Sequence, residues 1–116
     1  MGKIMDKSRK TKYVLISPAR NEEKYIAKTM ESVINQTVLP MKWVIVSDGS
    51  TDSTDEIVSW YATSHEYIQL LRVSNREKRD FSSKVNAFKA GVRQLNGLEY
   101  DFIGNLDADV SFEPDY

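Results

Sequence analysis

Asp107 and Asp109 are two carboxylates with one residue between them, directly after the short apolar run 102–106. Residues i and i+2 of an extended chain point to the same side, and their Cα atoms lie about 6.5–7 Å apart. Carboxylates this close repel each other, and a divalent cation with oxygen ligands relieves the repulsion. Such pairs are also common in solvated turns, so the position of this pair after a strand is what favours a metal site.

Polar loops follow three further apolar runs. The runs and their loops are residues 13–17 and 18–21, residues 43–47 and 48–52, and residues 68–73 and 74–81. Continuous apolar runs of this length are typical of strands buried on both faces of a parallel sheet. In the third loop, Arg76 and Arg79 are candidates for a diphosphate contact by position alone, and a solvated loop is the simpler interpretation.

Helical spacing of apolar residues predicts helices over 22–35, over 53–62 and from residue 82 or 83 to about 96. Their predicted apolar stripes are Ile26, Met30, Val33 and Ile34, then Ile57, Val58 and Tyr61, then Val85, Phe88, Val92 and Leu95. Their predicted starts are Asn21 as an N-cap, Ser53 with Glu56 as a capping box, and Ser82 or Ser83. Residues 113–116 resemble the first turn of a further helix.

The alternation of short strands with helices predicts a three-layer α/β/α fold with a mostly parallel, Rossmann-like sheet. Ligands of such sheets bind outside the carboxyl ends of the strands. The loops 18–21, 48–52 and 107–109 therefore meet at one rim, and the basic loop 74–81 reaches the same rim. Acidic and basic loops at one place suggest a charged ligand bridged by a metal, and a nucleoside diphosphate fits this description.

Composition limits the other possibilities. The chain has 116 residues and a formal net charge of −1, so one small domain is expected and no electrostatic case exists for nucleic acid. The absence of cysteine excludes disulfides and thiolate metal sites. We interpret the basic residues 1–11 as a solvated tail, with weak attraction to anionic lipid headgroups as the minor alternative. No apolar run reaches the length of a membrane span, so a cytoplasmic location is expected.

Several segments, taken together, resemble family 2 glycosyltransferases of the GT-A fold. They are residues 18–23, 32–37, 48–52, 83–91 and 107–109, in the order and spacing of that family. The resemblance implies the sheet order 3-2-1-4 and a nucleotide-diphosphate sugar as donor, with UDP-sugar favoured. It also implies inverting, hexosyltransferase-type transfer to a saccharide or lipid-linked acceptor with Mn²⁺ or Mg²⁺. Cell-envelope polysaccharide synthesis, in the cytoplasm or at the inner face of the membrane, is the family-level expectation.

The resemblance also assigns roles to residues. Asp109 would be the direct metal ligand, and Asp107 would face the ribose or sugar and assist at the metal. Asp48 would accept a hydrogen bond from the base, Ala19 would lie against the base or ribose, and Lys84 would approach the diphosphate or sugar. The full expected nucleotide-sugar set is Pro18, Ala19, Arg20, Asn21, Glu22, Asp48, Gly49, Ser50, Lys84, Asp107 and Ala108.

Two positions depart from the family pattern. The family often has an Asp where this chain has Ser47, and often a Tyr where this chain has Arg20, whose guanidinium plane could stack on the base instead. The family's domain is also roughly twice as long. Residues 12–116 are therefore expected to be the donor-binding half of a domain truncated after its fourth strand, inactive alone, with the general base beyond Tyr116. The fourth strand would then be an exposed edge open to self-association.

Other interpretations remain open on the residues alone. Asp48 and Asp52 could serve simply as caps of a turn and a helix. Glu22 could be an acidic residue in the first turn of a helix, without a ligand contact, and Lys84 could be solvated. A nucleotidyltransferase would need a glycine-rich loop after the first strand, and residues 17–21 contain no glycine. A phosphoacceptor receiver domain would need acidic residues where the first and third strands end, near Ser17 and Ser74. A nucleotide-binding module without activity is the last alternative.

Overall fold

The computed structural model describes residues 11–74 and 81–109, and the side chains of 81–83 are not described. The predictions for residues 1–10, for Arg76 and Arg79, and for residues 113–116 lie outside this range. The third helix was predicted from residue 82 or 83 to about 96, and it spans Phe81–Arg93 instead, so neither serine precedes it. The chain order is β1 (Tyr13–Ala19), α2 (Ile26–Ile34), β2 (Lys42–Asp48), α3 (Thr54–Ser64), β3 (Ile68–Val73), α4 (Phe81–Arg93) and β4 (Phe102–Asn105).

The four strands form one sheet in the order β3-β2-β1-β4, and all three pairings are parallel. This confirms the predicted fold class and strand order. The two strands beside β1 pair with it over different lengths. The pairing with β2 continues to Ala19, whereas the pairing with β4 ends at Ile16, opposite Asn105. The chain after β4 therefore leaves β1 early, and this separation leaves space at the carboxyl edge of the sheet.

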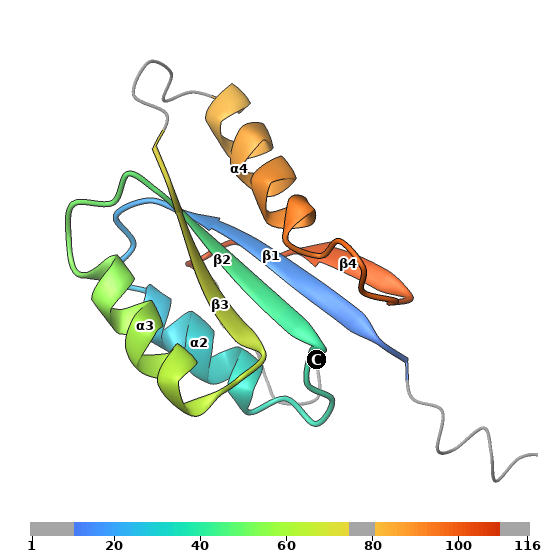
Figure 1. Cartoon of the computed structure of the whole chain (residues 1–116). Coiled ribbons are helices and arrows are strands. Elements are labelled where there is room, and N and C mark those ends of the chain that lie inside the picture. The colour runs from blue at the N-terminus through green and yellow to red at the C-terminus, as the bar shows by residue number, and fades with distance from the viewer. Residues whose placement is uncertain (1–10, 75–80, 110–116) are drawn as a thin grey trace, which may run out of the picture.

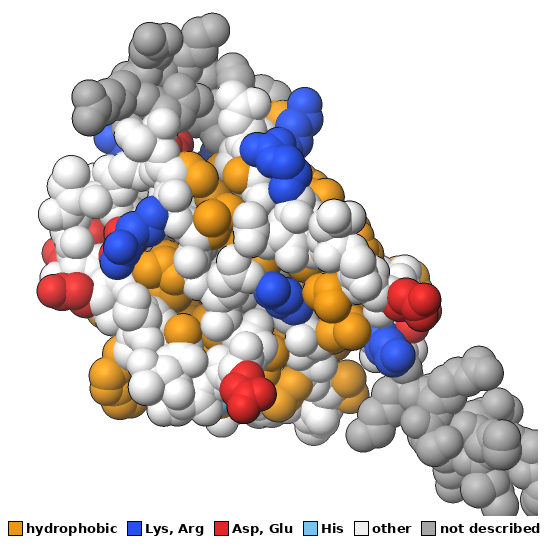
Figure 2. Space-filling model, viewed as in Figure 1, with side chains coloured by type: hydrophobic (Ala, Val, Ile, Leu, Met, Phe, Trp, Pro, Cys, Tyr) orange, Lys and Arg blue, Asp and Glu red, His pale blue; other side chains and the backbone are white. Residues whose placement is uncertain are grey.

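Two apolar layers cover the two faces of the sheet, with α2 and α3 on one side and α4 on the other (Figure 1). Successive residues of β2 alternate between them, because side chains of a strand point to opposite faces. Trp43 and Ile45 are buried with the α2–α3 layer, and Val44 and Val46 are buried with the α4 layer. On the side of the molecule seen in Figure 2, which has the view of Figure 1, the visible hydrophobic side chains lie in separate patches among polar ones.

The predicted apolar stripe is confirmed at Leu95, which is buried, and at Phe88 and Val92, which pack against the same cluster, but not at Val85. Small residues that the stripe did not include make the nearest approach of α4 to the sheet. Ala87, Ala90 and Gly91 are buried, whereas Val85 is exposed. A Cβ atom at Gly91 would lie 2.7 Å from Cγ2 of Ile16, so the helix backbone approaches the sheet more closely than any side chain would allow. Phe88 and Val92 are half-buried at the margin of this layer.

The two predicted caps of the first two helices were wrong. Helix α2 begins at Ile26 rather than at residue 22, and Asn21 lies outside it with a left-handed φ of 54°. Helix α3 begins at Thr54, and Ser53 makes no side-chain cap hydrogen bond. In both cases the polar groups before the helix are engaged in contacts between loops, described below.

Strand β4 is the edge of the described sheet, as predicted. Phe102 and Ile103 retain 63% and 39% of their full exposure, the largest apolar exposure in any strand of the described residues. Whether this edge mediates self-association stays a prediction.

Candidate functional site

A cavity of about 270 Å³ opens at the carboxyl edge of the sheet, where β1 and the chain after β4 separate. It draws residues from the end of β1, the end of β2, the start of α4 and the segment after β4. Its lining residues are Pro18, Ala19, Arg20, Glu22, Asp48, Lys84, Ala87, Asp107, Ala108 and Asp109. All of these except Ala87 were candidate site residues from the sequence. The other three candidates, Asn21, Gly49 and Ser50, do not line this cavity.

The two aspartates stand on either side of a buried residue. Asp107 and Asp109 are exposed, whereas Ala108 between them is 3% exposed and packs in the α2–α3 layer. The carbonyl of Ala108 accepts a hydrogen bond of 2.8 Å from the hydroxyl of Thr29, a buried residue of α2. The segment is therefore held from its inner side, and both carboxylates are left at the cavity.

Glu22 shares the electric field of these aspartates. Burial raises the pKa of Glu22, and the negative charges of Asp109, Asp52 and Asp107 raise it further, while the positive charge of Lys84 opposes the rise. Lys84 comes from α4, on the opposite face of the sheet from α2. The cavity thus joins an acidic wall from one layer with a lysine from the other.

Asp48 lies at the end of β2 and is 5% exposed. The next residue, Gly49, has a φ of 65°, and its amide donates to the carbonyl of Val73 at the end of β3. Because a side chain rarely adopts that φ, glycine allows the chain to turn directly after Asp48. The carboxylate is thus fixed at the rim beside Pro18 and Ala19.

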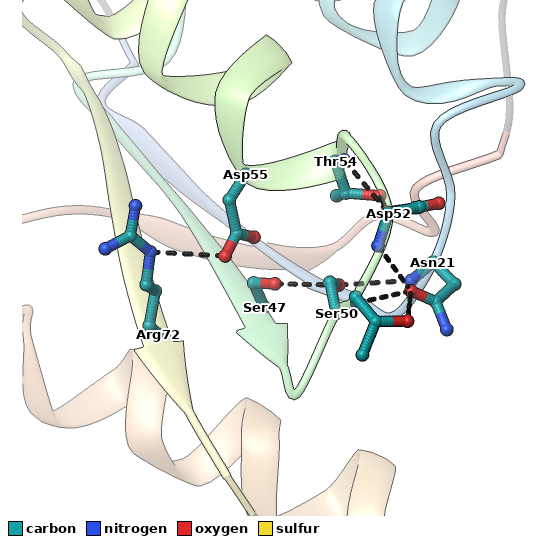
Figure 3. Close-up of polar contacts among 8 residues, drawn as sticks. Asn21, Ser47, Ser50, Asp52, Thr54, Asp55 and Arg72 are labelled. Atoms are coloured by element: carbon teal, nitrogen blue, oxygen red, sulfur yellow. Dashed lines mark hydrogen bonds and ion pairs between the residues drawn. The ribbon is translucent and has the colours of Figure 1, made fainter.

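Asn21 ties the loop after β1 to the loop after β2 (Figure 3). Its side-chain oxygen accepts hydrogen bonds from the amides of Thr51, at 2.8 Å, and Asp52, at 3.3 Å. The backbone amide of Asn21 donates to the hydroxyl oxygen of Ser50, which also accepts from the hydroxyl of Ser47. Asn21 and Ser50 therefore position loops around the cavity in this structure.

Asp52 makes the second set of contacts between these loops. Its carboxylate accepts from the amides of Glu23, at 3.1 Å, and Thr54, at 2.9 Å, and from the Thr54 hydroxyl. Burial raises the pKa of Asp52, but these hydrogen bonds outweigh that effect and hold the pKa below its ordinary value. The Thr54 hydroxyl oxygen accepts from the amide of Glu22, and Glu23 accepts from the amide of Ser53. Asp52, rather than Ser53, therefore caps α3.

The carboxylates at the cavity fit a hard divalent cation whose other ligands are phosphate oxygens and water. Among residues 11–74 and 81–109, no group of three or more His, Cys, Asp or Glu is arranged to hold a metal. Mg²⁺ in nucleotide sites is commonly bound through one or two carboxylates, with the remaining ligands supplied by water and substrate phosphates. Asp107 and Asp109 provide such a pair at the cavity.

Fold and cavity together define an α/β domain with a cavity lined by charged residues at the carboxyl edge of a parallel sheet. Residues 14–116 match the family model described as glycosyl transferase family 2, and the chain belongs to this family. It is 34% identical over 98 residues to the chondroitin synthase of Escherichia coli, covering 84% of this chain and 13% of the synthase. It is 36% identical over 106 residues to the uncharacterized glycosyltransferase YibD of E. coli K12, covering 89% of this chain and 27% of that protein.

Solved structures agree with the fold. The structure of S. aureus TarS superposes with a TM-score of 0.71 at 24% identity, over 90% of this chain and 18% of that one. TarS 1–349 in complex with UDP gives a TM-score of 0.68 at 25% identity, over 90% of this chain and 29% of that one. The chain therefore spans less than a third of each of these relatives. No helix in the described part is long and apolar enough to cross a membrane.

Sequence reasoning missed Thr29 and Ala87. Thr29 had a signal, because it is a polar residue on the apolar stripe of α2, between Ile26 and Met30. A threonine in that place needs a hydrogen-bond partner, since buried polar groups are rarely left unpaired. Ala87 gave no signal, because only the close approach of α4 to the sheet brings a methyl group to the cavity.

Proposed function

We propose that this chain forms the donor-binding part of a glycosyltransferase that uses a nucleotide-diphosphate sugar, with UDP-sugar favoured. The observation that carries the proposal is the cavity, in which Asp48, Lys84 and the pair Asp107 and Asp109 converge from both layers. Two relatives support it by the contents of their structures. TarS 1–349 was solved with UDP-GlcNAc, at 26% identity, and a mannosyltransferase of Pyrobaculum calidifontis with GDP-Man and Mn²⁺, at 25% identity.

In this proposal the base binds near the end of β1 and the diphosphate binds toward α4. Asp48 accepts the N3–H of uracil, Ala19 lies against the base or ribose, and the guanidinium of Arg20 stacks on the base. Lys84 contributes a positive charge to the diphosphate. Glu22, at the acidic wall, contacts the nucleotide or sugar.

The metal, Mn²⁺ or Mg²⁺, would be held by Asp109 directly, with Asp107 assisting and facing the ribose or sugar. When bound, it acts as a Lewis acid toward the leaving diphosphate. The residues of this chain bind and orient the donor so that the anomeric carbon faces the acceptor. Inverting transfer also needs a general base for the acceptor hydroxyl. We assign that role to residues after Tyr116, so the chain alone is expected to bind the donor without transferring the sugar.

The acceptor in this proposal is a saccharide or a lipid-linked saccharide, and the product is a cell-envelope polysaccharide made at the cytoplasmic side of the membrane. Several relatives are polysaccharide synthases by name, including the poly-beta-1,6-N-acetyl-D-glucosamine synthase of Staphylococcus epidermidis, 28% identical over 95 residues. Peripheral membrane contact through residues 1–11 and self-association through β4 belong to the same proposal. A nucleotide-binding module without transfer activity is the second candidate, since every role that we propose for the cavity residues concerns binding and none is that of a general base.

Calorimetric titration of UDP, with and without Mn²⁺, tests the proposal. We expect Mn²⁺-dependent binding that Asp109→Asn weakens by at least about tenfold, because even the loss of a residue that only orients a metal ligand commonly costs that much. The matched control is Glu99→Gln, which neutralises an exposed carboxylate in the loop before β4 and should bind as the parent chain does. GDP in place of UDP decides the base. Absence of UDP binding, or binding that is equal with and without Mn²⁺ and unchanged in Asp109→Asn, would refute the proposal.

A further inference from the structure

The acidic pair lies beyond the last backbone contact that connects β4 with β1 in the described residues. The amide of Leu106 donates to the carbonyl of Ile16 at 3.0 Å, one residue after β4 ends at Asn105. From Asp107 onward the chain has left the sheet. Carboxylates outside a sheet are held less firmly than those on a strand, so some other contact must fix their separation and direction.

Helix α2 supplies that contact through Thr29. The Thr29 hydroxyl is 2.8 Å from the carbonyl oxygen of Ala108 and 3.3 Å from the carbonyl oxygen of Tyr25, four residues earlier in its own helix. A threonine in a helix commonly donates its hydroxyl to the carbonyl four residues earlier in the same helix. A hydroxyl has only one proton to donate, and the shorter distance indicates that it is directed mainly to Ala108.

The side chain of Ala108 provides a second point of attachment. It is 3% exposed and belongs to the same buried cluster as Ile26 and Met30, which flank Thr29 on α2. The methyl group and the carbonyl of one residue are therefore both held by one helix. The residues before and after it carry the carboxylates at the cavity.

We propose that Thr29 is a positioning residue for the acidic pair: its hydrogen bond to Ala108 sets the direction of the Asp107 and Asp109 carboxylates toward the divalent cation of the nucleotide. This rests on the proposed function. Without the hydroxyl, the buried carbonyl of Ala108 loses its partner. A buried acceptor without a partner is unfavourable, so the peptide rotates toward another donor and carries the adjacent carboxylate with it.

A purely structural role makes a different prediction. If Thr29 only satisfies a polar group in the core, then substitutions should change stability and leave the nucleotide site as it was. Thr29→Val keeps the shape of the side chain and removes the donor. Thr29→Ser keeps the donor and removes a methyl group, which leaves a small void. Positioning predicts that affinity follows the hydroxyl, whereas a packing role predicts that Thr29→Ser is affected too.

The first measurement is the Mn²⁺-dependent dissociation constant of UDP for the parent chain and the variants. We expect Thr29→Val to weaken binding by about tenfold or more, the loss typical of removing a group that orients a metal ligand. Thr29→Ser should stay within about twofold of the parent chain, because it retains the donor. The control is Thr63→Val, since the exposed Thr63 hydroxyl bonds only to the Ser59 carbonyl of its own helix among the described contacts.

The second measurement needs no ligand. NMR of the metal-free protein should show a changed Ala108 carbonyl ¹³C shift and lower amide order parameters for residues 107–109 in Thr29→Val, and parent-like values in Thr29→Ser. Unchanged order and affinity in Thr29→Val would overturn the proposal, and so would equal losses in both variants. If the parent chain binds no UDP, the proposed function fails, and the NMR comparison alone then decides whether Thr29 holds the pair.

Discussion

Replacing Asn21 with alanine removes the acceptor that joins the loops after β1 and β2. The amides of Thr51 and Asp52 both donate to the side-chain oxygen of Asn21. The substitution also places a Cβ-bearing residue without a polar side chain at a φ of 54°. Asparagine tolerates this left-handed conformation better than other non-glycine residues, so two separate effects are expected from one change.

The size of each effect follows from the structure. The two amides are near the surface, where water can replace the lost acceptor, so the low end of about 0.5–1.5 kcal/mol for each net hydrogen bond applies. The left-handed backbone adds about 1 kcal/mol for alanine. Asn21→Ala should therefore lower the free energy of unfolding by about 2–3 kcal/mol. Asn21→Gly loses the acceptor but adopts the same φ without strain, so it should cost about 1 kcal/mol less.

Equilibrium unfolding in urea measures both variants, provided that the dependence of the free energy on urea is unchanged. Asn96→Ala, at an exposed asparagine after α4, is the control and should stay within about 0.5 kcal/mol of the parent chain. Equal free energies for Asn21→Ala and Asn21→Gly would show that the backbone at this position is not strained. Values within about 0.5 kcal/mol of the parent chain for both would show that the loops are joined by other contacts.

Three other substitutions give sharp outcomes. Gly91→Ala would place a Cβ 2.7 Å from Cγ2 of Ile16, so thermal unfolding should show a loss of about 1–3 kcal/mol, although alanine is the better helix former; an increase in stability would mean that α4 can move outward. Because the pKa of Glu22 is raised in the folded state, its ionisation opposes folding. Glu22→Gln should therefore be more stable than the parent chain at pH 7, and urea unfolding at a series of pH values should show that this gain disappears as the pH falls below 4.5. A gain in stability that does not depend on pH would contradict this. The hydroxyl of Tyr61 donates to Glu31 at 2.7 Å, and burial, together with that carboxylate, raises the pKa of Tyr61 to about 12. Tyr61→Phe should therefore lower the free energy of unfolding by about 1 kcal/mol at neutral pH, and the difference from the parent chain should shrink as the pH rises from 10 to 12. A constant difference over that range would count against the bond.

The strands could be predicted from the sequence because burial on both faces leaves a continuous apolar run. Trp43 to Val46 is such a run, and the structure buries its members alternately in the two layers. The carboxyl edge could also be predicted, since parallel strands point their ends to the same side. Asp48, Asp107 and Asp109 follow from these two facts together with their polar types at the strand ends. Lys84, which is in α4, and Ala19 were expected only because of the family resemblance.

The helix starts could not be predicted, because they depend on contacts between loops distant in sequence. Residue Asn21 is a good cap by type, but its oxygen binds amides thirty residues later in the chain. Ser53 and Glu56 have the spacing of a capping box, but the amide of Ser53, which the Glu56 side chain would accept from in that box, donates to Glu23 instead. Local propensity shows which residues can cap a helix, and tertiary contacts decide which of them do.

The large residues Phe88, Val92 and Leu95 on the buried side of α4 could be predicted, but the small ones could not, for a different reason. Hydrophobic periodicity gives weight to large residues such as Val85, whereas the helix packs through Ala87, Ala90 and Gly91. The distance between helix and sheet is a property of the assembled layers. A pattern of residue types along one helix contains no information about that distance, so the small residues were overlooked.

The division of the apolar interior into two layers means that the cavity can be adjusted from two independent directions. Its acidic wall is supported by α2, and its lysine is carried by α4, with the sheet between them. Volume changes in one layer reach one wall first. A substitution beneath α4 can shift Lys84 while Asp107 and Asp109 keep their support. Under the proposed function, variants could therefore alter the side assigned to the diphosphate and the side assigned to the metal separately, so donor preference would change while the arrangement of Asp107 and Asp109 is kept.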